Sequence, residues 1–589
     1  MCGIAGVMTS NGGPPDQAVL EAMAKALAHR GPDGTGHYRA GDTAMVHRRL
    51  AVIDLVTGDQ PIMIKNGPAL IANAEIYNYR ELAADLGNTP LATRSDCEPP
   101  LHCYRRYGLD FVDSLRGMYA IAIHDPAADR LVLARDPFGI KPLYFLERPD
   151  LFAFASEPQA LIAAGLIAPA VAKDALGELL QLQYAGGRQS LFAGIERVLP
   201  GELLVISHGR IVERHRRAAL PEGPPERASL GQALARLDQA LENSVHAHQQ
   251  ADVPFGMFLS GGIDSSALLV LMARLNSRPV RAYTAGFRAA GVADERAQAR
   301  AVAQAVGAEA VEVEIDSAQF WRRLPEIAAA VDDACADYAV VPTYLLAERA
   351  AKEVKVILSG EGGDEMLAGY GRYRAALRPW WRGGRAMRAR GVFDRLNVLR
   401  ELPPAWRDSV ATAAVNATAP GRSRLQILQA SDCVDWLPND LLVKLDRCLM
   451  AHGLEGRTPF LDVELAKTLF RLPDDMKLSG DVGKWLLRQW LDQRLPVARA
   501  FERKRGFTVP VAEWIAERGV RLGPLIEAQP AIRAICRPGR VAPLYRARGK
   551  HAGFAGWTLL FYALWHRRHI LGLAPAGDVF ETLAATPRD

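Results

Sequence analysis

A cysteine at the second position is the residue of this sequence best suited to covalent chemistry. The chain begins Met1-Cys2-Gly3-Ile4, and an initiator methionine that precedes a small residue is usually removed. A mature chain that starts at Cys2 carries a thiol and an α-amine on one residue. The amine has a reference pKa of roughly 7.7–8.0, so it can accept the thiol proton near neutral pH. The alternative is an ordinary buried cysteine, and lipidation is disfavoured because no apolar signal segment precedes it.

A turn rich in glycine and serine follows the apolar run 254–259 and precedes a predicted helix. It reads Ser260-Gly-Gly-Ile-Asp264-Ser-Ser266. Glycines let the backbone approach an anion, and a helix N-terminus offers free N–H groups. Asp264 can hold a divalent cation that bridges phosphates. No lysine follows the glycines, so the loop is not a Walker A motif. It resembles the PP-loop of ATP pyrophosphatases, which form acyl-adenylates; the alternative is a glycine turn that caps a helix.

A second acidic glycine turn, Ser359-Gly-Glu361-Gly-Gly-Asp364, also follows a predicted strand. Ligands of open α/β sheets bind beyond the carboxyl ends of the strands. The two loops are therefore predicted to face one nucleotide, with Asp264 and Asp364 sharing a Mg²⁺ ion.

The pattern of strands and helices predicts two domains. The first, to residue 212, mixes short β-like runs with helical patterns near 15–29 and 95–116, which indicates an α+β layered domain. A polar, proline-rich stretch at 213–227 is the predicted linker. From 228 onward strands and helices alternate, which predicts a parallel sheet, and the chain beyond about 370 is predicted to be largely helical. The predicted strands are 44–46, 69–72, 119–124, 131–135, 143–146, 151–155, 201–206, 254–259, 281–287, 311–315 and 354–358.

Composition excludes several classes of protein. The 589 residues are 49% hydrophobic and 23% charged, as in soluble globular proteins, and the net charge of +5 gives no argument for nucleic acid or an anionic membrane. Seven cysteines without a CxxC pair favour a reducing cytoplasm, with neither a disulfide framework nor a zinc site. No apolar run reaches the roughly 18 residues of a membrane span. His566 and His569 lack a ligand spacing and are expected to face solvent on a basic helix.

Further motifs accompany the cysteine and the two loops in a fixed order. Together they resemble the glutamine-hydrolysing asparagine synthetase family along most of the chain. The motifs are Arg30-Gly-Pro-Asp33, His47-Arg-Arg-Leu-Ala-Val-Ile-Asp54, Asn73-Ala-Glu75-Ile-Tyr-Asn78, Ser95-Asp-Cys-Glu98, Arg135-Asp-Pro-Phe-Gly-Ile-Lys-Pro-Leu-Tyr144, Ala155-Ser-Glu157, Lys444-Leu-Asp-Arg447, Glu455-Gly-Arg-Thr-Pro-Phe-Leu-Asp462, Lys484-Trp-Leu-Leu-Arg488 and Lys504-Arg-Gly-Phe-Thr508.

The resemblance implies that residues 2–212 form an Ntn-type αββα glutaminase domain, a class II amidotransferase domain that releases ammonia from glutamine. A guanidinium would bind the substrate α-carboxylate, carboxylates its ammonium, and an amide and a backbone N–H the oxyanion. The implied catalytic residues are Cys2, Asn73 and Ala74, and the implied glutamine-binding residues are Arg49, Asn73, Glu75 and Asp96. The family has Gly at position 74, so a requirement for positive φ there would strain Ala74.

Residues 228–589 are implied to form the ATP-dependent synthetase domain, with an adenine nucleotide α-hydrolase-like fold. There ATP and Mg²⁺ convert a carboxylate to an acyl-adenylate, and ammonia that has passed inside the protein displaces AMP. Glutamine, ATP and the carboxylate are the implied partners, with a homodimer as the expected assembly. The implied catalytic residues are Glu361 and Lys484, and the implied metal ligands are Asp264 and Asp364. The implied ATP-binding residues are Ser260, Gly261, Gly262, Asp264, Ser265, Ser266, Ala285, Ser359 and Gly360.

The acceptor stays open at this point. The leading hypothesis is conversion of aspartate to asparagine, with AMP, pyrophosphate and glutamate as products. Gly363 stands where well-known asparagine synthetases carry Ser, which keeps open the amidation of a peptide, secondary-metabolite or polysaccharide precursor. A non-catalytic pseudo-synthetase that serves as a binding subunit is a further alternative, against which the intact Cys2, Glu361 and Lys484 argue. A GMP or NAD synthetase fits poorly with a glutaminase cysteine at position 2.

Overall fold

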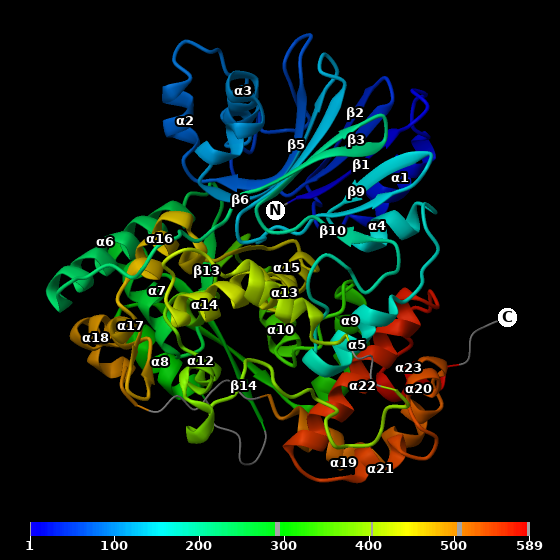
Figure 1. Cartoon of the computed structure of the whole chain (residues 1–589), viewed down its shortest axis with the longest axis vertical. Helices are drawn as coiled ribbons and strands as arrows, with labels where there is room; N and C mark the ends of the chain where they lie inside the picture. Colours follow the sequence, from blue (N-terminus) through cyan, green and yellow to red (C-terminus); the bar gives the residue numbers. More distant parts are fainter. Residues whose placement is uncertain (1, 289–294, 402–404, 503–508, 586–589) are drawn as a thin grey trace.

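The computed structural model describes residues 2–288, 295–401, 405–502 and 509–585. The motif at 504–508 therefore lies outside the described residues. Figure 1 shows two stacked bodies, the upper one built mainly from the blue and cyan part of the chain and the lower one mainly from the green to red part.

The first body consists of two facing antiparallel sheets with helices on both outer sides. Helices α1 (Gln17–Ala26) and α4 (Pro158–Ala163) cover one sheet, and α2 (Tyr79–Asp85) and α3 (Glu98–Tyr107) cover the other (Figure 1). The first sheet has the order β10 (Glu196–Arg197), β8 (Tyr144–Glu147), β9 (Leu151–Ala155), β1 (Gly3–Thr9), β3 (Thr43–Arg49), β2 (Gly34–Ala40). The second has the order β12 (Arg210–Arg216), β11 (Glu202–Ser207), β7 (Arg130–Arg135), β6 (Gly117–Asp125), β5 (Ala69–Ile76), β4 (Ile62–Met63). This is the predicted αββα architecture.

Side chains of the central strands alternate between two cores. In β1, Ile4 and Met8 enter the core between the sheets, whereas Ala5 and Val7 pack on the side of α1. Because successive strand residues point to opposite faces, a strand buried on both sides needs apolar residues throughout. The run of small and apolar residues in β1 meets this need.

Two boundaries differ from the sequence prediction. The helical pattern at 95–116 is interrupted: α3 ends at Tyr107, Gly108 adopts a φ of 61°, and a 3₁₀ helix follows over Gly108–Ser114. Strand β12 continues to Arg216, so the first domain extends beyond residue 212. The end of the predicted linker packs on the second domain, where the N–H of Glu226 donates to the carbonyl of Arg471 at 2.7 Å.

The second body is built around a five-stranded parallel sheet. Its order is β15 (Glu309–Ile315), β14 (Arg281–Phe287), β13 (Phe255–Phe258), β16 (Val356–Leu358), β17 (Glu455–Arg457). Helices α7 (Ile263–Leu275), α8 (Arg296–Ala305) and α10 (Val340–Ala350) follow or connect these strands. The strand order reverses between β13 and β16, and such switch points are where open α/β sheets bind ligands. Strand β17 was not predicted, because its sequence, Glu-Gly-Arg, has no apolar run.

The C-terminal part is helical, as predicted, and includes α14 (Arg424–Val434), α15 (Leu442–Met450), α18 (Trp485–Arg494), α19 (Val511–Glu527) and α22 (Lys550–His569). The prediction that the basic end of α22 faces solvent is wrong for His569. His569 is only 5% exposed and its Nε2 lies 3.2 Å from the carbonyl oxygen of Ala328. Helix α22 is buried on most sides, so its basic end does not mark a solvent face.

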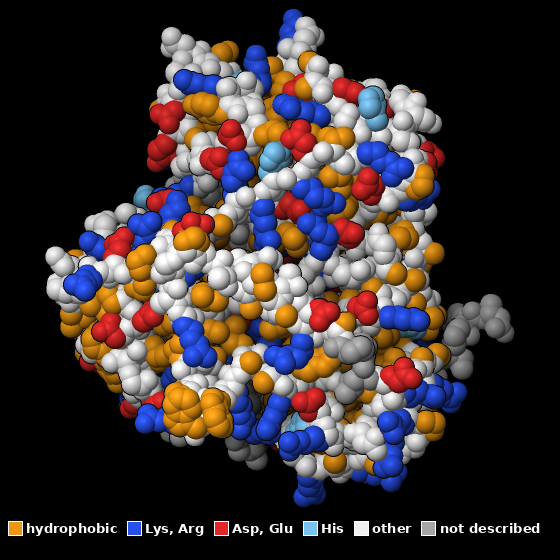
Figure 2. Space-filling view, viewed as in Figure 1, with side chains coloured by type: hydrophobic (Ala, Val, Ile, Leu, Met, Phe, Trp, Pro, Cys, Tyr) orange, Lys and Arg blue, Asp and Glu red, His pale blue; other side chains and the backbone are white. Residues whose placement is uncertain are grey.

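Of the helices in the described ranges, none combines the length and the apolar character needed to cross a membrane. The face in Figure 2 carries basic and acidic side chains interspersed over both bodies.

Candidate functional site

Cys2 lies between the two sheets of the first domain, directly before β1. Its side chain is buried, and its backbone N–H donates to Oδ1 of Asn73 on β5 of the other sheet at 3.0 Å. The thiol faces the carbonyl of Leu50 at 3.9 Å. Burial raises the pKa of the Cys2 thiol above its ordinary value, so forming the thiolate requires a base.

Two hydrogen-bond donors beside Cys2 are left without acceptors. The Nδ2 of Asn73 is buried and has no partner among the described residues. Along one edge of β5, the N–H of Ala72 donates to Oε1 of Gln60 at 2.6 Å. The N–H of Ile76 donates to Oδ2 of Asp96 at 2.8 Å on the same edge. The two-residue period of the strand directs the N–H of Ala74 to the same edge, where no described group accepts it. An uncommitted pair of donors is what an oxyanion requires.

Ala74 carries no backbone strain. It lies inside β5, opposite Tyr119 of β6, and is not among the described residues with positive φ. The possibility of strain raised by the family's glycine is therefore not realised, because the extended backbone accepts alanine.

The expected glutamine-binding carboxylates lie close to one another. Asp96 accepts the N–H of Ile76, the neighbour of Glu75, and burial raises the pKa of Asp96 to about 6. Glu75 is 4% exposed, and its Oε2 lies 2.7 Å from a terminal nitrogen of Arg457 in the second domain. Neither of these two atoms has a partner with hydrogen-bond geometry, so Glu75 keeps accepting capacity. Arg49 is held by Asp59 at 2.8 Å and by the carbonyl of Asp54.

A cavity of about 550 Å³ opens at the switch point of the parallel sheet. Both predicted loops line it, because β13 and β16 are parallel neighbours and each loop leaves the end of its strand. The predicted residues in its wall are Ser260, Asp264, Ser265, Ala285, Ser359, Gly360, Glu361 and Asp364. Gly261 adopts a φ of +66°, and Gly262 begins α7 without a side-chain cap, which leaves the first N–H groups of that helix for an anion.

A lysine joins the two aspartates of the loops. The Nζ of Lys484 contacts Oδ2 of Asp264 and lies 2.6 Å from Oδ1 of Asp364. Burial alone would lower the pKa of Lys484, but the two carboxylates outweigh it and raise the pKa. Lys484 therefore stays charged, next to the loop that is shaped for phosphates.

Comparison with known proteins assigns both halves. The asparagine synthase family model matches residues 236–567, and the glutamine amidotransferase domain model matches residues 1–216. Asparagine synthetase [glutamine-hydrolyzing] 1 of Bacillus subtilis is 30% identical, over 97% of this chain and 97% of that protein. The chain belongs to the glutamine-hydrolysing asparagine synthetase family. A Mycobacterium tuberculosis protein assigned to the same family is 33% identical over 96% of this chain and 97% of its own, and asparagine synthetase B of Escherichia coli is 27% identical over 84% and 79%.

Membership makes this chain an enzyme of the asparagine synthetase type, a glutamine-dependent amidotransferase with ATP as a substrate. Not every predicted residue reaches the cavity of this family member. Ser266, in the first turn of α7, is fully buried, and its hydroxyl has no partner among the described residues. Gly363 does not line the cavity either; a Cβ at this position would lie 2.5 Å from Oδ1 of Asp264. Its missing side chain thus makes room for Asp264 rather than for an acceptor.

Several wall residues were not predicted from the sequence. Lys444 on α15 pairs with Asp337 at 2.7 Å and lies 3.9 Å from Oε1 of Glu361. Burial raises the pKa of Glu361, and Lys444 partly opposes that rise. Lys444 belongs to a motif of the family resemblance, but nothing in its spacing indicated a neighbour on the second loop. The other unpredicted polar or aromatic wall residues include Tyr370, Arg372, Trp436 and Asp440.

One residue connects the two candidate centres. The side chain of Arg457 reaches Glu75 of the first domain, at 2.7 Å. The backbone carbonyl of Arg457 accepts the N–H of Ser359, the first residue of the second loop, at 2.8 Å.

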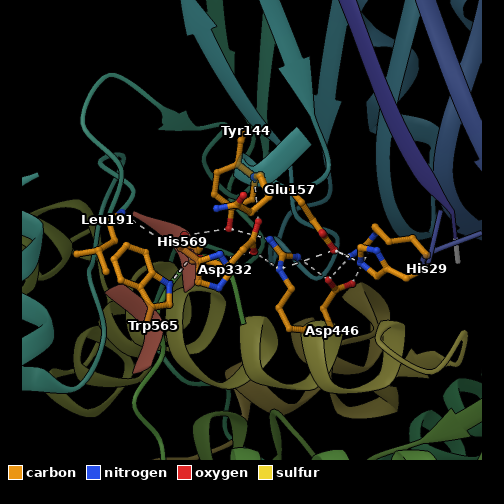
Figure 3. A network of polar contacts seen from close by, with 12 residues as sticks. His29, Tyr144, Glu157, Leu191, Asp332, Asp446, Trp565 and His569 are labelled. Atoms are coloured by element: carbon orange, nitrogen blue, oxygen red, sulfur yellow. Dashed lines mark hydrogen bonds and ion pairs between the residues drawn. The ribbon is translucent and has the colours of Figure 1, made fainter. Parts of the chain in front are cut away.

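A buried ionic network fastens the domains near this link. Figure 3 shows Glu157 and His29 of the first domain near Asp446 on α15. Arg30 lies between them, 2.7 Å from Glu157 and 2.8 Å from Asp446, and its Nε donates to the carbonyl of Cys2 at 3.2 Å. A buried charge costs least when it is fully paired, and these groups are.

Proposed function

We propose that this chain releases ammonia from glutamine at Cys2 and uses it to convert aspartate to asparagine, with ATP cleaved to AMP and pyrophosphate. The observation that carries the proposal is the pair of unused donors on Asn73 and Ala74 beside Cys2, in a domain joined through Arg457 to the loop of the ATP-type cavity.

In the first step the sulfur of Cys2 attacks the side-chain amide carbon of glutamine. The α-amine of Cys2, free once residue 1 is removed, takes the thiol proton and gives it to the leaving ammonia. Asn73 Nδ2 and the N–H of Ala74 stabilise the oxyanion, while Glu75 and Asp96 hold the substrate ammonium. Arg49 releases its ion pair with the exposed side chain of Asp59 and binds the α-carboxylate of glutamine instead. Water then hydrolyses the thioester to glutamate.

In the second step a carboxylate oxygen of the acceptor attacks the α-phosphorus of ATP, and pyrophosphate leaves. Ser260, Ser265 and the first N–H groups of α7 bind the phosphates, and Lys484 offsets their charge. Ammonia travels within the protein, attacks the acyl-adenylate carbon and displaces AMP. Glu361, whose pKa burial raises, accepts the proton that the attacking nitrogen loses.

The donor set fits Mg²⁺. Oδ1 of Asp264 is buried and has no hydrogen-bond partner among the described residues, and a carboxylate oxygen is the ligand type that Mg²⁺ prefers. Asp264 and Asp364 would hold the ion, which supplies charge neutralisation at the phosphates; Lys484, now between the two carboxylates, would move toward the leaving pyrophosphate.

The test measures AMP release by the purified protein with aspartate and either glutamine or ammonia. We expect Cys2→Ala to lose the glutamine-dependent activity and to keep the ammonia-dependent one, whereas Lys484→Ala loses both. An intact mass that begins at Cys2 is a further expectation. Loss of both activities in Cys2→Ala, or AMP release with another acid but not with aspartate, would contradict the proposal.

A further inference from the structure

Part of the cavity wall combines aromatic rings with one arginine. Tyr370, Arg372 and Trp436 line it together. Arg372 lies in α12 (Gly371–Leu377), and Trp436 directly precedes the π-helical turn Leu437–Leu441. Another part of the wall, with Ala285 and Leu346, is apolar and suits an adenine ring. The arginine corner therefore has a chemistry of its own.

The guanidinium of Arg372 is held in one orientation. Its carbon lies 3.7 Å from the ring centroid of Tyr370 and 4.0 Å from that of Trp436. Its Nε and Nη2 both donate to Oδ2 of Asp432, at 2.9 and 2.7 Å. Nη1 has no partner among the described residues. A fixed guanidinium with an unused edge binds a carboxylate without a further loss of side-chain entropy.

Charge at this corner is not balanced. Asp432 is fully buried and also accepts from Arg388, at 3.1 Å, so two guanidinium groups share one carboxylate. Glu365 accepts the hydroxyl of Tyr370 at 2.9 Å and forms no ion pair with Arg372 among the described residues. Lys444, the other cation in the described part of the wall, is already neutralised by Asp337 at 2.7 Å. Arg372 is the cation left to meet an anionic ligand group.

We propose that Arg372 binds the carboxylate of the acceptor that is not adenylated. The acceptor is then a small acid with two carboxylates, such as aspartate, and a monocarboxylic acceptor leaves the guanidinium unmatched. This inference rests on the proposed function, whose adenylation chemistry it takes as given. Pyrophosphate, the other anion of the reaction, is the competing ligand for the same side chain.

The experiment compares L-aspartate with its α-amide, which keeps the side-chain carboxylate and lacks the second one. Ammonia replaces glutamine, so that the measured AMP release reports only the second domain. We expect wild type to prefer aspartate in kcat/KM by about 10- to 100-fold, the usual effect of one charge-assisted hydrogen-bonded contact. In Arg372→Gln the preference should fall to within about threefold, and Arg372→Lys should lie between the two.

Arg388→Gln is the matched control, since it removes the other guanidinium on Asp432 and does not line the cavity; it should keep the preference. Unchanged glutaminase activity and melting temperature of Arg372→Gln show that the variant folds. If Arg372→Gln lost kcat/KM equally for both acids, the inference would be overturned. The same holds if the variant kept its preference for aspartate and instead showed a raised KM for ATP or pyrophosphate. AMP release from wild type that favours monocarboxylic acids overturns it too. No AMP release with any acid refutes the proposed function itself.

Discussion

Replacing Asn73 by aspartate isolates one oxyanion donor. In the structure Oδ1 of Asn73 accepts the N–H of Cys2 at 3.0 Å, whereas Nδ2 is buried and unused. Asn73→Asp keeps the size and the accepting oxygen and exchanges only the donor for a second oxygen. Loss of one such donor costs about 2.7–4 kcal/mol of transition-state stabilisation, or roughly 100- to 1,000-fold in kcat. Negative charge next to the developing oxyanion adds to this loss.

Glutamate release without ATP measures the effect, and ammonia-dependent AMP release should remain at the wild-type level. Ala74→Gly is the matched control: its donor is a backbone N–H in an extended strand, so the variant should stay within about threefold of wild type. If Asn73→Asp kept its kcat and showed only a raised KM for glutamine, Asn73 would act in substrate binding and the oxyanion assignment would be refuted.

Three further predictions concern other parts of the site. Gly363→Ser places a Cβ 2.5 Å from Oδ1 of Asp264; displacing that carboxylate should slow ATP–pyrophosphate exchange by at least about tenfold and leave glutaminase activity intact. Burial raises the pKa of Asp96 to about 6, so kcat/KM for glutamine should fall about tenfold per pH unit below pH 6 as the carboxylate is lost, as a pH–rate profile of glutamate release can test. For stability the sign is opposite: the fold favours the neutral form, so the contribution of Asp96 is lost as pH rises from about 4 to 6. Asp446→Asn deprives buried Arg30 of a charged partner and should cost about 3–5 kcal/mol, seen as a lower melting temperature in calorimetry; an unchanged melting temperature would show that Glu157 alone suffices.

Short-range patterns carried most of the fold prediction. Strand β14 occupies 281–287, as its apolar run indicates, and both phosphate-type loops follow predicted strands. Strands β1 and β2 were missed, since their glycines lower β propensity and hide the period of two. Their stability comes from pairing: β1 lies between β3 and β9, and that arrangement is a tertiary property.

The same distinction between local pattern and tertiary arrangement applies to the residues of the candidate site. Residues that a local turn places in the cavity wall, such as Asp264 and Glu361, could be located from the sequence. Arg372 could not, because its significance arises from two rings and a buried carboxylate, and the ring of Trp436 and Asp432 come from a segment about sixty positions away in the chain. Ser266 shows the converse case: it belongs to the motif, yet its side chain is buried and does not line the cavity.

The position of Arg457 gives a physical reason for the two reactions to share one chain. Strand β17 pairs with β16, so the backbone of Arg457 is fixed to the strand that carries the second loop. Its guanidinium is fully buried, held by Glu455 and by the carbonyls of His248 and Gln250, at 2.9 and 2.7 Å for the carbonyls. A substrate ammonium that binds Glu75 competes with this guanidinium for the same carboxylate. If Glu75 binds the substrate ammonium as proposed, we expect this competition to act on β17 and on Ser359, whose N–H donates to the carbonyl of Arg457 at 2.8 Å.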